Sequence, residues 1–181
     1  MNALFCCLVA LGGLASDDSK GTLVEIDGVQ SQTPADWTPK GSTSKFRIKE
    51  FELTAAKGDS TNANLTIFFF GEGSGGSIDD NVKRWKTMFV PPEGKTVDQV
   101  SKLENKKING IDVAYFEISG SYKYKARPFD QSEQPQLRPN YRMIDIIMET
   151  KKGPYFIRLV GPAATVEHHK KAFDDWLNAF K

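Results

Sequence analysis

The segment 64–89 constrains the fold more than any other part of the chain, because an apolar run, a glycine-rich turn and an amphipathic pattern follow one another there. The amphipathic pattern predicts a helix over 77–89. Ser77 can cap it, with Asp80 three residues later, which is the spacing of a capping box. Apolar residues recur at helical spacing and are expected to face a core: Ile78, Val82, Trp85 and either Phe89 or Met88.

The glycines of this turn also fit the G-x-G-x-x-G pattern of dinucleotide-binding sites, through Gly71, Gly73 and Gly76. Such a site needs a helix N-terminus that is free to receive a phosphate. Here Asp79 and Asp80 occupy the first helical turn, where they stabilise the helix dipole and would repel a phosphate. We therefore expect a flexible strand-to-helix connection with positive φ angles, and no nucleotide site.

Further strands are expected to pair mainly as antiparallel hairpins. Asn109-Gly110 is a strong hairpin turn, and residues 151–154 are a second one. The expected order is β-β-β-α-β-β-β-β-α, an α+β fold in which an antiparallel β-sheet is sandwiched by helices. The predicted strands are 22–26, 46–55 with a bulge near Lys49-Glu50, 63–70, 99–107 as a polar edge, 111–119, 141–150 and 155–160.

Two other regions carry specific expectations. Residues 28–44 are rich in glycine, proline, serine and threonine and are expected to form a loop, in which Trp37 plugs one end of the core. A second helix is predicted over 164–180, with Thr165 as its cap and an apolar face. The residues of that face are Val166, Phe173, Leu177 and Phe180.

The N-terminus has the features of an export signal. Residues 3–15 form an uncharged apolar run that is too short to span a bilayer of about 30 Å. We expect a signal peptide over 1–15, cleaved after Ala15, a linker over 16–21 and one domain over 22–181. No basic residue precedes the run, so a buried N-terminal element and an uncleaved anchor stay open as alternatives. The mature form is expected to be extracytoplasmic, without a transmembrane span, and to lack Cys6 and Cys7.

Composition and histidine content restrict the possible functions. Lys and Arg number 24 against 23 Asp and Glu, so no basic field would attract nucleic acid. His168 and His169 are adjacent on the predicted last helix and point about 100° apart, so they cannot share a metal ion. We predict no metal site and no cofactor. The enzymatic alternative is a small hydrolase that uses His168 or His169 as a base.

The polar segment 121–140 is predicted to be an insertion loop, and it contains the best candidate binding surface. Aromatic and cationic residues alternate in and beside it, a composition suited to sugars, peptides or acidic partners. The alternative is that the rings cover one end of the sheet while the cations are solvated. The candidate residues are Tyr122, Tyr124, Arg127, Phe129, Arg138, Tyr141 and Arg142.

Several short motifs together resemble the PsbP/Mog-like fold, and more closely uncharacterised secreted bacterial proteins that carry it. They are Pro-Ala-Asp before Trp37, the strand start Phe46-Arg47, and Gly75-Gly76-Ser77 with Asn81, Arg84-Trp85 and Phe89. The resemblance covers about residues 22–181. It implies an α-β-α sandwich that serves as a non-catalytic binding or assembly module, with an unknown protein or small ligand as partner. No residue here matches the photosystem or Ran-binding roles found in this fold, and we expect a monomer or weak oligomer.

Overall fold

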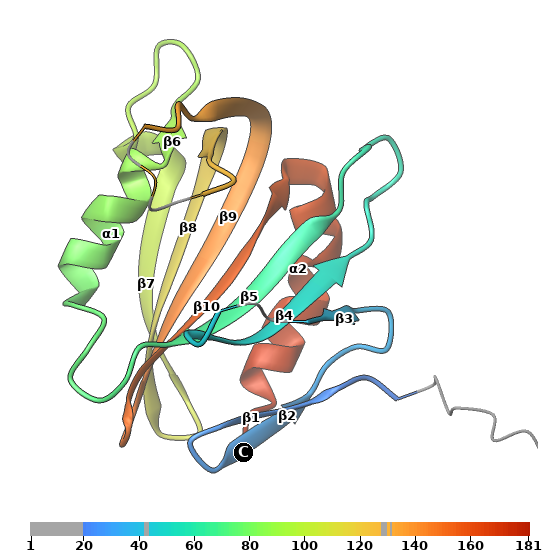
Figure 1. Cartoon of the computed structure of the whole chain (residues 1–181), viewed down its shortest axis with the longest axis vertical. Helices are drawn as coiled ribbons and strands as arrows, with labels where there is room; N and C mark the ends of the chain where they lie inside the picture. Colours follow the sequence, from blue (N-terminus) through green and yellow to red (C-terminus); the bar gives the residue numbers. More distant parts are fainter. Residues whose placement is uncertain (1–19, 42–43, 128–129, 131) are drawn as a thin grey trace, which may run out of the picture.

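A computed structural model describes residues 20–41, 44–127, 130 and 132–181. Its centre is an eight-stranded antiparallel sheet with the order β3-β4-β5-β10-β9-β8-β6, in which β7 also pairs with β8 (Figure 1). The strands are β3 Thr38–Lys40, β4 Arg47–Leu53, β5 Ala63–Phe69, β6 Phe89–Val90, β7 Ser101–Ile108, β8 Ile111–Tyr124, β9 Gln136–Thr150 and β10 Gly153–Pro162. A separate hairpin joins β1 Leu23–Ile26 to β2 Val29–Gln32.

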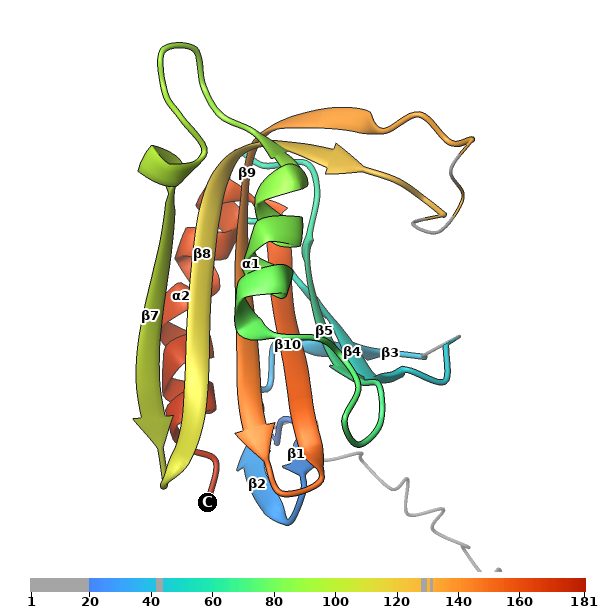
Figure 2. The ribbon, with the colours of Figure 1, turned by 90° about the vertical axis from the view of Figure 1, so that its left-hand side faces the viewer.

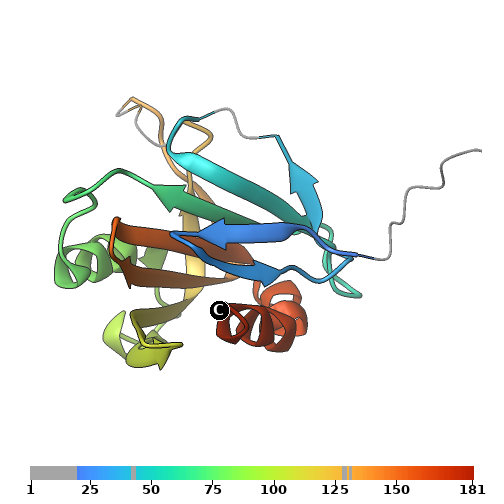
Figure 3. The same cartoon turned by 90° about the horizontal axis from the view of Figure 1, so that it is seen from below.

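The two helices lie on opposite faces of this sheet, α1 Ile78–Thr87 on one side and α2 Ala163–Asn178 on the other (Figure 3). Because side chains alternate along a strand, each face builds a core of its own. Val82 and Trp85 of α1 belong to one core, and Val166 and Phe173 of α2 belong to the other. The predicted α+β fold, with a sheet between helices, is confirmed.

The start of α1 agrees with the expectation from the sequence. Ser77 is the N-cap and accepts a hydrogen bond from the backbone N–H of Asp80 at 3.1 Å. The preceding glycines have positive φ angles, as predicted for a turn. The helix ends at Thr87, however, and Phe89 already belongs to β6, which pairs with β8. Phe89 is nevertheless buried in the core beneath α1.

The predicted loop over 28–44 is wrong in part, because β2 and β3 lie within it. Both strands are short and polar, so no apolar alternation marked them. The expectation for Trp37 is confirmed: its side chain is buried and packs against Phe51 and Trp176, with ring centroids 6.4 and 5.4 Å away. The bulge in β4 is also present, between Arg47 and Lys49.

The cap of α2 differs from the prediction. The N-cap position is Pro162, and Thr165 lies inside the first turn. Asp59, from the turn after β4, takes the capping role instead. Its Oδ2 accepts hydrogen bonds from the Thr165 backbone N–H at 3.0 Å and the Thr165 hydroxyl at 2.6 Å. A carboxylate more than 100 residues away in the chain thus satisfies one of the free N–H groups at the start of the helix.

The segment predicted as an insertion loop over 121–140 is strand at both of its ends. β8 continues to Tyr124 and β9 begins at Gln136, and their outer parts form a two-stranded arm, 121–140 (Figure 2). The arm projects at the top of the molecule, toward the end of the sheet that carries β4 and β5. Among the described residues between the two strands, 125–127, 130 and 132–135 belong to no helix or strand, as predicted. The prediction of β7 as a polar edge is confirmed, since β8 is its one partner among the described strands.

Candidate functional site

Four of the predicted surface residues meet here. Tyr122, Tyr124 and Arg138 share one face of the arm, and Tyr141, at the base of the arm, contacts Tyr122 and Arg138. The Arg138 guanidinium carbon lies 3.4 Å from the centroid of the Tyr124 ring, close enough for a cation–π contact. The rings of Tyr122 and Tyr141 are stacked with centroids 5.9 Å apart. We call these four residues the arm cluster. Its base joins the α1-side core, because Tyr122 also packs against Phe89.

A break in the strand register explains why Arg138 belongs to this face. Gly120 pairs with Tyr141, whereas Tyr122 pairs with Arg138, so β9 has one extra residue between these pairs. Asn140 lies there with φ of 55°, the left-handed conformation that asparagine tolerates better than most residues. The bulge reverses the alternation of β9. Without it, Arg138 would point to the opposite face of the arm.

The other predicted residues are elsewhere. Arg142 lies on the α2 side of the sheet, where it forms ion pairs with Glu117 and Glu167. Arg127 lies near the end of the arm, where it pairs with Asp130 at 2.8 Å and Glu133 at 3.6 Å. Phe129 falls outside the described residues. The candidate surface is therefore smaller than predicted, and it consists of the arm cluster.

A buried ion pair lies in the sheet below the arm cluster. Arg158 of β10 faces Asp145 of β9, and its Nε and Nη2 donate to the two carboxylate oxygens at 2.8 and 2.9 Å. The Asp145 side chain is 2% exposed and that of Arg158 19% exposed. Burial raises the pKa of Asp145, although the guanidinium groups of Arg158 and Arg84 oppose this shift. Desolvation thus outweighs attraction at this carboxylate.

Arg84 and Tyr122 interact electrostatically with the ion pair. Arg84 projects from α1 and donates through Nη2 to Asn81 Oδ1 at 2.5 Å. Desolvation lowers the pKa of Arg84, and the neighbouring charge of Arg158 lowers it further. Burial raises the pKa of the Tyr122 hydroxyl, on which Arg158, Asp145 and Arg138 also act. The charges of Arg84, Asp145 and Arg158 therefore influence one another.

The sequence-based predictions did not include Asp145, Arg158 or the charge of Arg84. A signal for two of them was present. Asp145 interrupts the apolar run 143–148, and Arg158 interrupts the apolar run 155–160. A lone charge in a strand that is otherwise apolar is expected to have a partner. The hairpin turn between the strands sets Arg158 opposite Asp145, so the pair was predictable from the register.

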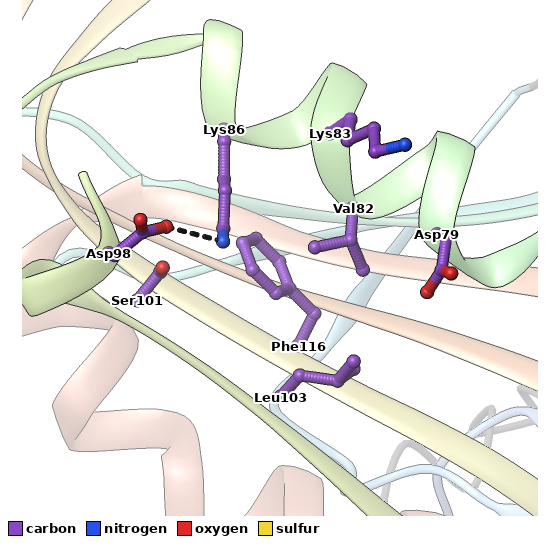
Figure 4. Close-up of a pocket in the computed structure, with 8 residues that line it drawn as sticks. All are labelled: Asp79, Val82, Lys83, Lys86, Asp98, Ser101, Leu103 and Phe116. Atoms are coloured by element: carbon purple, nitrogen blue, oxygen red, sulfur yellow. Dashed lines mark hydrogen bonds and ion pairs between the residues drawn. The ribbon is translucent and has the colours of Figure 1, made fainter.

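A separate groove runs along the other side of α1, between the helix and β7 (Figure 4). Its volume is about 420 Å³. Val82, Leu103 and the fully buried Phe116 supply apolar lining. Lys86 and Asp98 join across one end of the groove through an ion pair of 2.6 Å. The eight lining residues include no histidine or cysteine, and we identify no arrangement for nucleophilic chemistry among them.

The two histidines do not form a site together. His169 is buried, and its Nε2 donates to the Thr54 carbonyl oxygen at 2.9 Å, which ties α2 to the end of β4. His168 is exposed on the same helix. Across the described ranges, no group of three or more histidine, cysteine, aspartate or glutamate residues is placed to hold a metal ion. Neither α1 nor α2 combines the length and apolar character of a bilayer-spanning helix.

Comparison with known proteins identifies the fold. No family model matches the sequence, and no curated protein does. The solution structure of cyanobacterial PsbP (CyanoP) from Synechocystis sp. PCC 6803 matches with a TM-score of 0.52 and 12% identity, over 96% of this chain and 98% of that one. The crystal structure of PA94 from Pseudomonas aeruginosa, a protein of unknown function, matches with a TM-score of 0.47 and 16% identity, over 87% of this chain and 93% of that one. The likeness to CyanoP shows a PsbP-like fold, as the sequence motifs implied, and at this identity it shows the fold alone.

Proposed function

We propose that this protein is a non-catalytic binding or accessory module that acts outside the cytoplasm and engages a partner through the arm cluster. One observation carries the proposal: Tyr124 and Arg138 form a cation–π pair on an arm that extends beyond both helices. Aromatic and arginine side chains supply much of the binding energy in protein interfaces. The extracytoplasmic location rests on the apolar segment 3–15 and the polar residues that follow it.

The enzymatic alternative, a hydrolase with His168 or His169 as base, has less support. The Nε2 atom of His169 is engaged by a backbone carbonyl, and the ring is buried. His168 is accessible, and its ring lies 4.9 Å from that of His169. Replacement of both histidines with alanine separates the two proposals: a folded variant that has lost a measured hydrolytic activity would favour the enzyme.

The binding proposal is tested by quantitative capture of partners from an extract of the source cells. The double variant Y124A/R138A removes the cation–π pair. The control L137A changes the neighbouring residue, whose side chain lies on the opposite face of the arm because Leu137 pairs with Lys123. We expect at least one partner to be recovered by the wild type and by L137A, and lost from Y124A/R138A. Equal recovery by all three proteins would contradict the proposal.

A further inference from the structure

The edge strand β7 has a row of backbone groups that pair with no described strand. Ile108 and Ile111 flank the two-residue turn Asn109-Gly110, so they exchange backbone hydrogen bonds as the first pair of the hairpin. Bonded and outward-facing residues alternate from there along β7. Every second residue therefore directs its backbone N–H and C=O away from β8, where the described part of the chain provides no further strand (Figure 2). These residues are Ser101, Leu103, Asn105 and Lys107.

On the α1 side of the sheet, an apolar surface lies beside this free edge. Leu103 is 40% exposed, and it pairs with Phe116 of β8, whose side chain is fully buried. Together with Val82 of α1, these residues line the groove between α1 and β7 (Figure 4). An apolar residue opposite Leu103 on an added strand would pack against it beside the groove. The edge thus offers backbone pairing and an apolar contact at the same residue.

The α2 side of the same edge carries two lysines. Because side chains alternate along a strand, Lys102, Glu104 and Lys106 share this side, where they line one small pocket. Glu104 forms ion pairs with both lysines, and Lys106 Nζ also lies 3.9 Å from the centroid of the Tyr115 ring. One carboxylate therefore serves two ammonium groups. An acidic residue directly opposite either lysine on an added strand would form a favourable cross-strand pair.

Other cations close to this row already have acidic partners. Lys107, on the α1 side of β7, pairs with Asp112. Behind the row lie two cations and three acids that pair with one another: Lys170 and Arg142, with Glu117, Glu167 and Asp174. Those groups leave no excess of positive charge. An acidic strand would therefore be attracted by the two lysines of the edge itself, and only where its acids lie opposite them.

We infer that β7 binds an extended polypeptide segment as an added antiparallel strand, with an apolar residue opposite Leu103 and acidic residues opposite Lys102 and Lys106. The inference goes beyond the proposed function, because β7 contains no residue of the arm cluster. A row of alternating N–H and C=O groups is matched by an extended backbone, whereas a helix uses its own backbone groups internally. β7 carries three lysines and one glutamate, so a second copy of this chain would bring the same net charge to the edge.

A designed peptide tests the inference on the full chain. The blocked heptapeptide Thr-Glu-Thr-Thr-Leu-Glu-Thr places its residues opposite positions 107 to 101, in that order. In an NMR titration of the isotope-labelled protein, we expect shift changes centred on the amides of the four outward-facing residues. An N-methyl group on the peptide leucine removes the bond that this residue donates to the Leu103 carbonyl, and it should weaken binding about tenfold. Lysine in place of both glutamates should also weaken binding about tenfold.

Variants of the exposed edge side chains complete the test. K102Q/K106Q should weaken binding of the heptapeptide about fivefold. K107Q is the matched control, because it removes a lysine from the same strand on the other face, and it should change the affinity less than about twofold.

No binding, equal affinities of the N-methylated and unmodified peptides, or equal affinities of the glutamate and lysine peptides would each overturn the inference. Equal losses in K102Q/K106Q and K107Q, shift changes centred on the arm cluster, or pairing of β7 with a second copy of the chain would overturn it as well.

Discussion

Replacing Arg158 with methionine should destabilise the protein by an amount that depends on pH. The substitution keeps an unbranched side chain but leaves the Asp145 carboxylate, only 2% exposed, without its bidentate partner. Removing one member of a buried ion pair costs about 3–5 kcal/mol. The carboxyl can limit this cost by binding a proton, which requires about 1.36 kcal/mol for each pH unit above its ordinary pKa of 3.8. The ceiling is therefore about 4.4 kcal/mol at pH 7 and about 1.6 kcal/mol at pH 5.

The sign of the pH dependence follows from proton binding. In R158M the folded state holds the Asp145 proton more tightly than the unfolded chain does. Stability due to this group is therefore present below pH 3.8 and is lost as the pH rises toward the folded pKa. Between pH 5 and pH 7 the loss should approach about 2.7 kcal/mol. The opposite sign is expected for a carboxylate whose folded pKa is depressed.

Urea unfolding at pH 5, 6 and 7 measures how the stability of R158M changes with pH, and the double variant D145L/R158M serves as the reference. The double variant contains no buried carboxylate at this position, so its stability should lack the extra slope. It should lie within about 1 kcal/mol of the wild type or above it, because burial costs the pair about as much as attraction returns. A cost below about 1 kcal/mol for R158M at pH 7, or one that does not change with pH, would refute the reasoning.

Three further substitutions test the packing. D59A removes the acceptor that caps α2 and should lower the free energy of unfolding in urea by about 1 kcal/mol. D59N keeps an acceptor oxygen and should lower it less. Equal losses in the two variants would argue against the cap. H169A should destabilise the protein by about 1–3 kcal/mol, because the Thr54 carbonyl loses its donor. The stability of H168A should stay within about 0.5 kcal/mol of the wild type. Similar losses in the two variants would contradict a structural role that belongs to His169 alone. G75A should cost more than G71A: both residues have positive φ angles, but only at residue 75 would a new Cβ meet the Phe156 ring, at 2.7 Å. Calorimetric melting of the two glycine variants shows whether the ring contact matters.

The parts of the fold that were predictable are those in which local pattern and burial agree. The α1 stripe is one example, because Val82 and Trp85 recur at helical spacing and enter the core. The hairpin at Asn109-Gly110 is another, since both residues adopt the positive φ angles that this dipeptide favours. In each case the residues that set the local conformation lie next to the element that they define.

The arm and the cap of α2 were not predictable in the same way. The outer parts of β8 and β9 are polar, and Pro139 disfavours a strand, so backbone pairing rather than burial holds this region extended. Which face Arg138 occupies depends on one extra residue at the Asn140 bulge, and alternation alone cannot reveal it. Asp59 reaches Thr165 only because the chain folds back on itself, so nothing near Thr165 in the sequence indicates the cap.

The central claim, that a partner contacts the arm cluster, is tested most directly by photo-crosslinking in the source cells. Gln136 pairs with Tyr124 and shares its face of the arm, while the next residue, Leu137, is 55% exposed on the opposite face. A photoreactive phenylalanine analogue is placed at one position or the other. The two positions are adjacent in the sequence, but they lie on opposite faces of the arm. We predict a discrete crosslinked adduct from position 136 and none from position 137. Adducts of equal yield from both positions, or from 137 alone, would contradict the account.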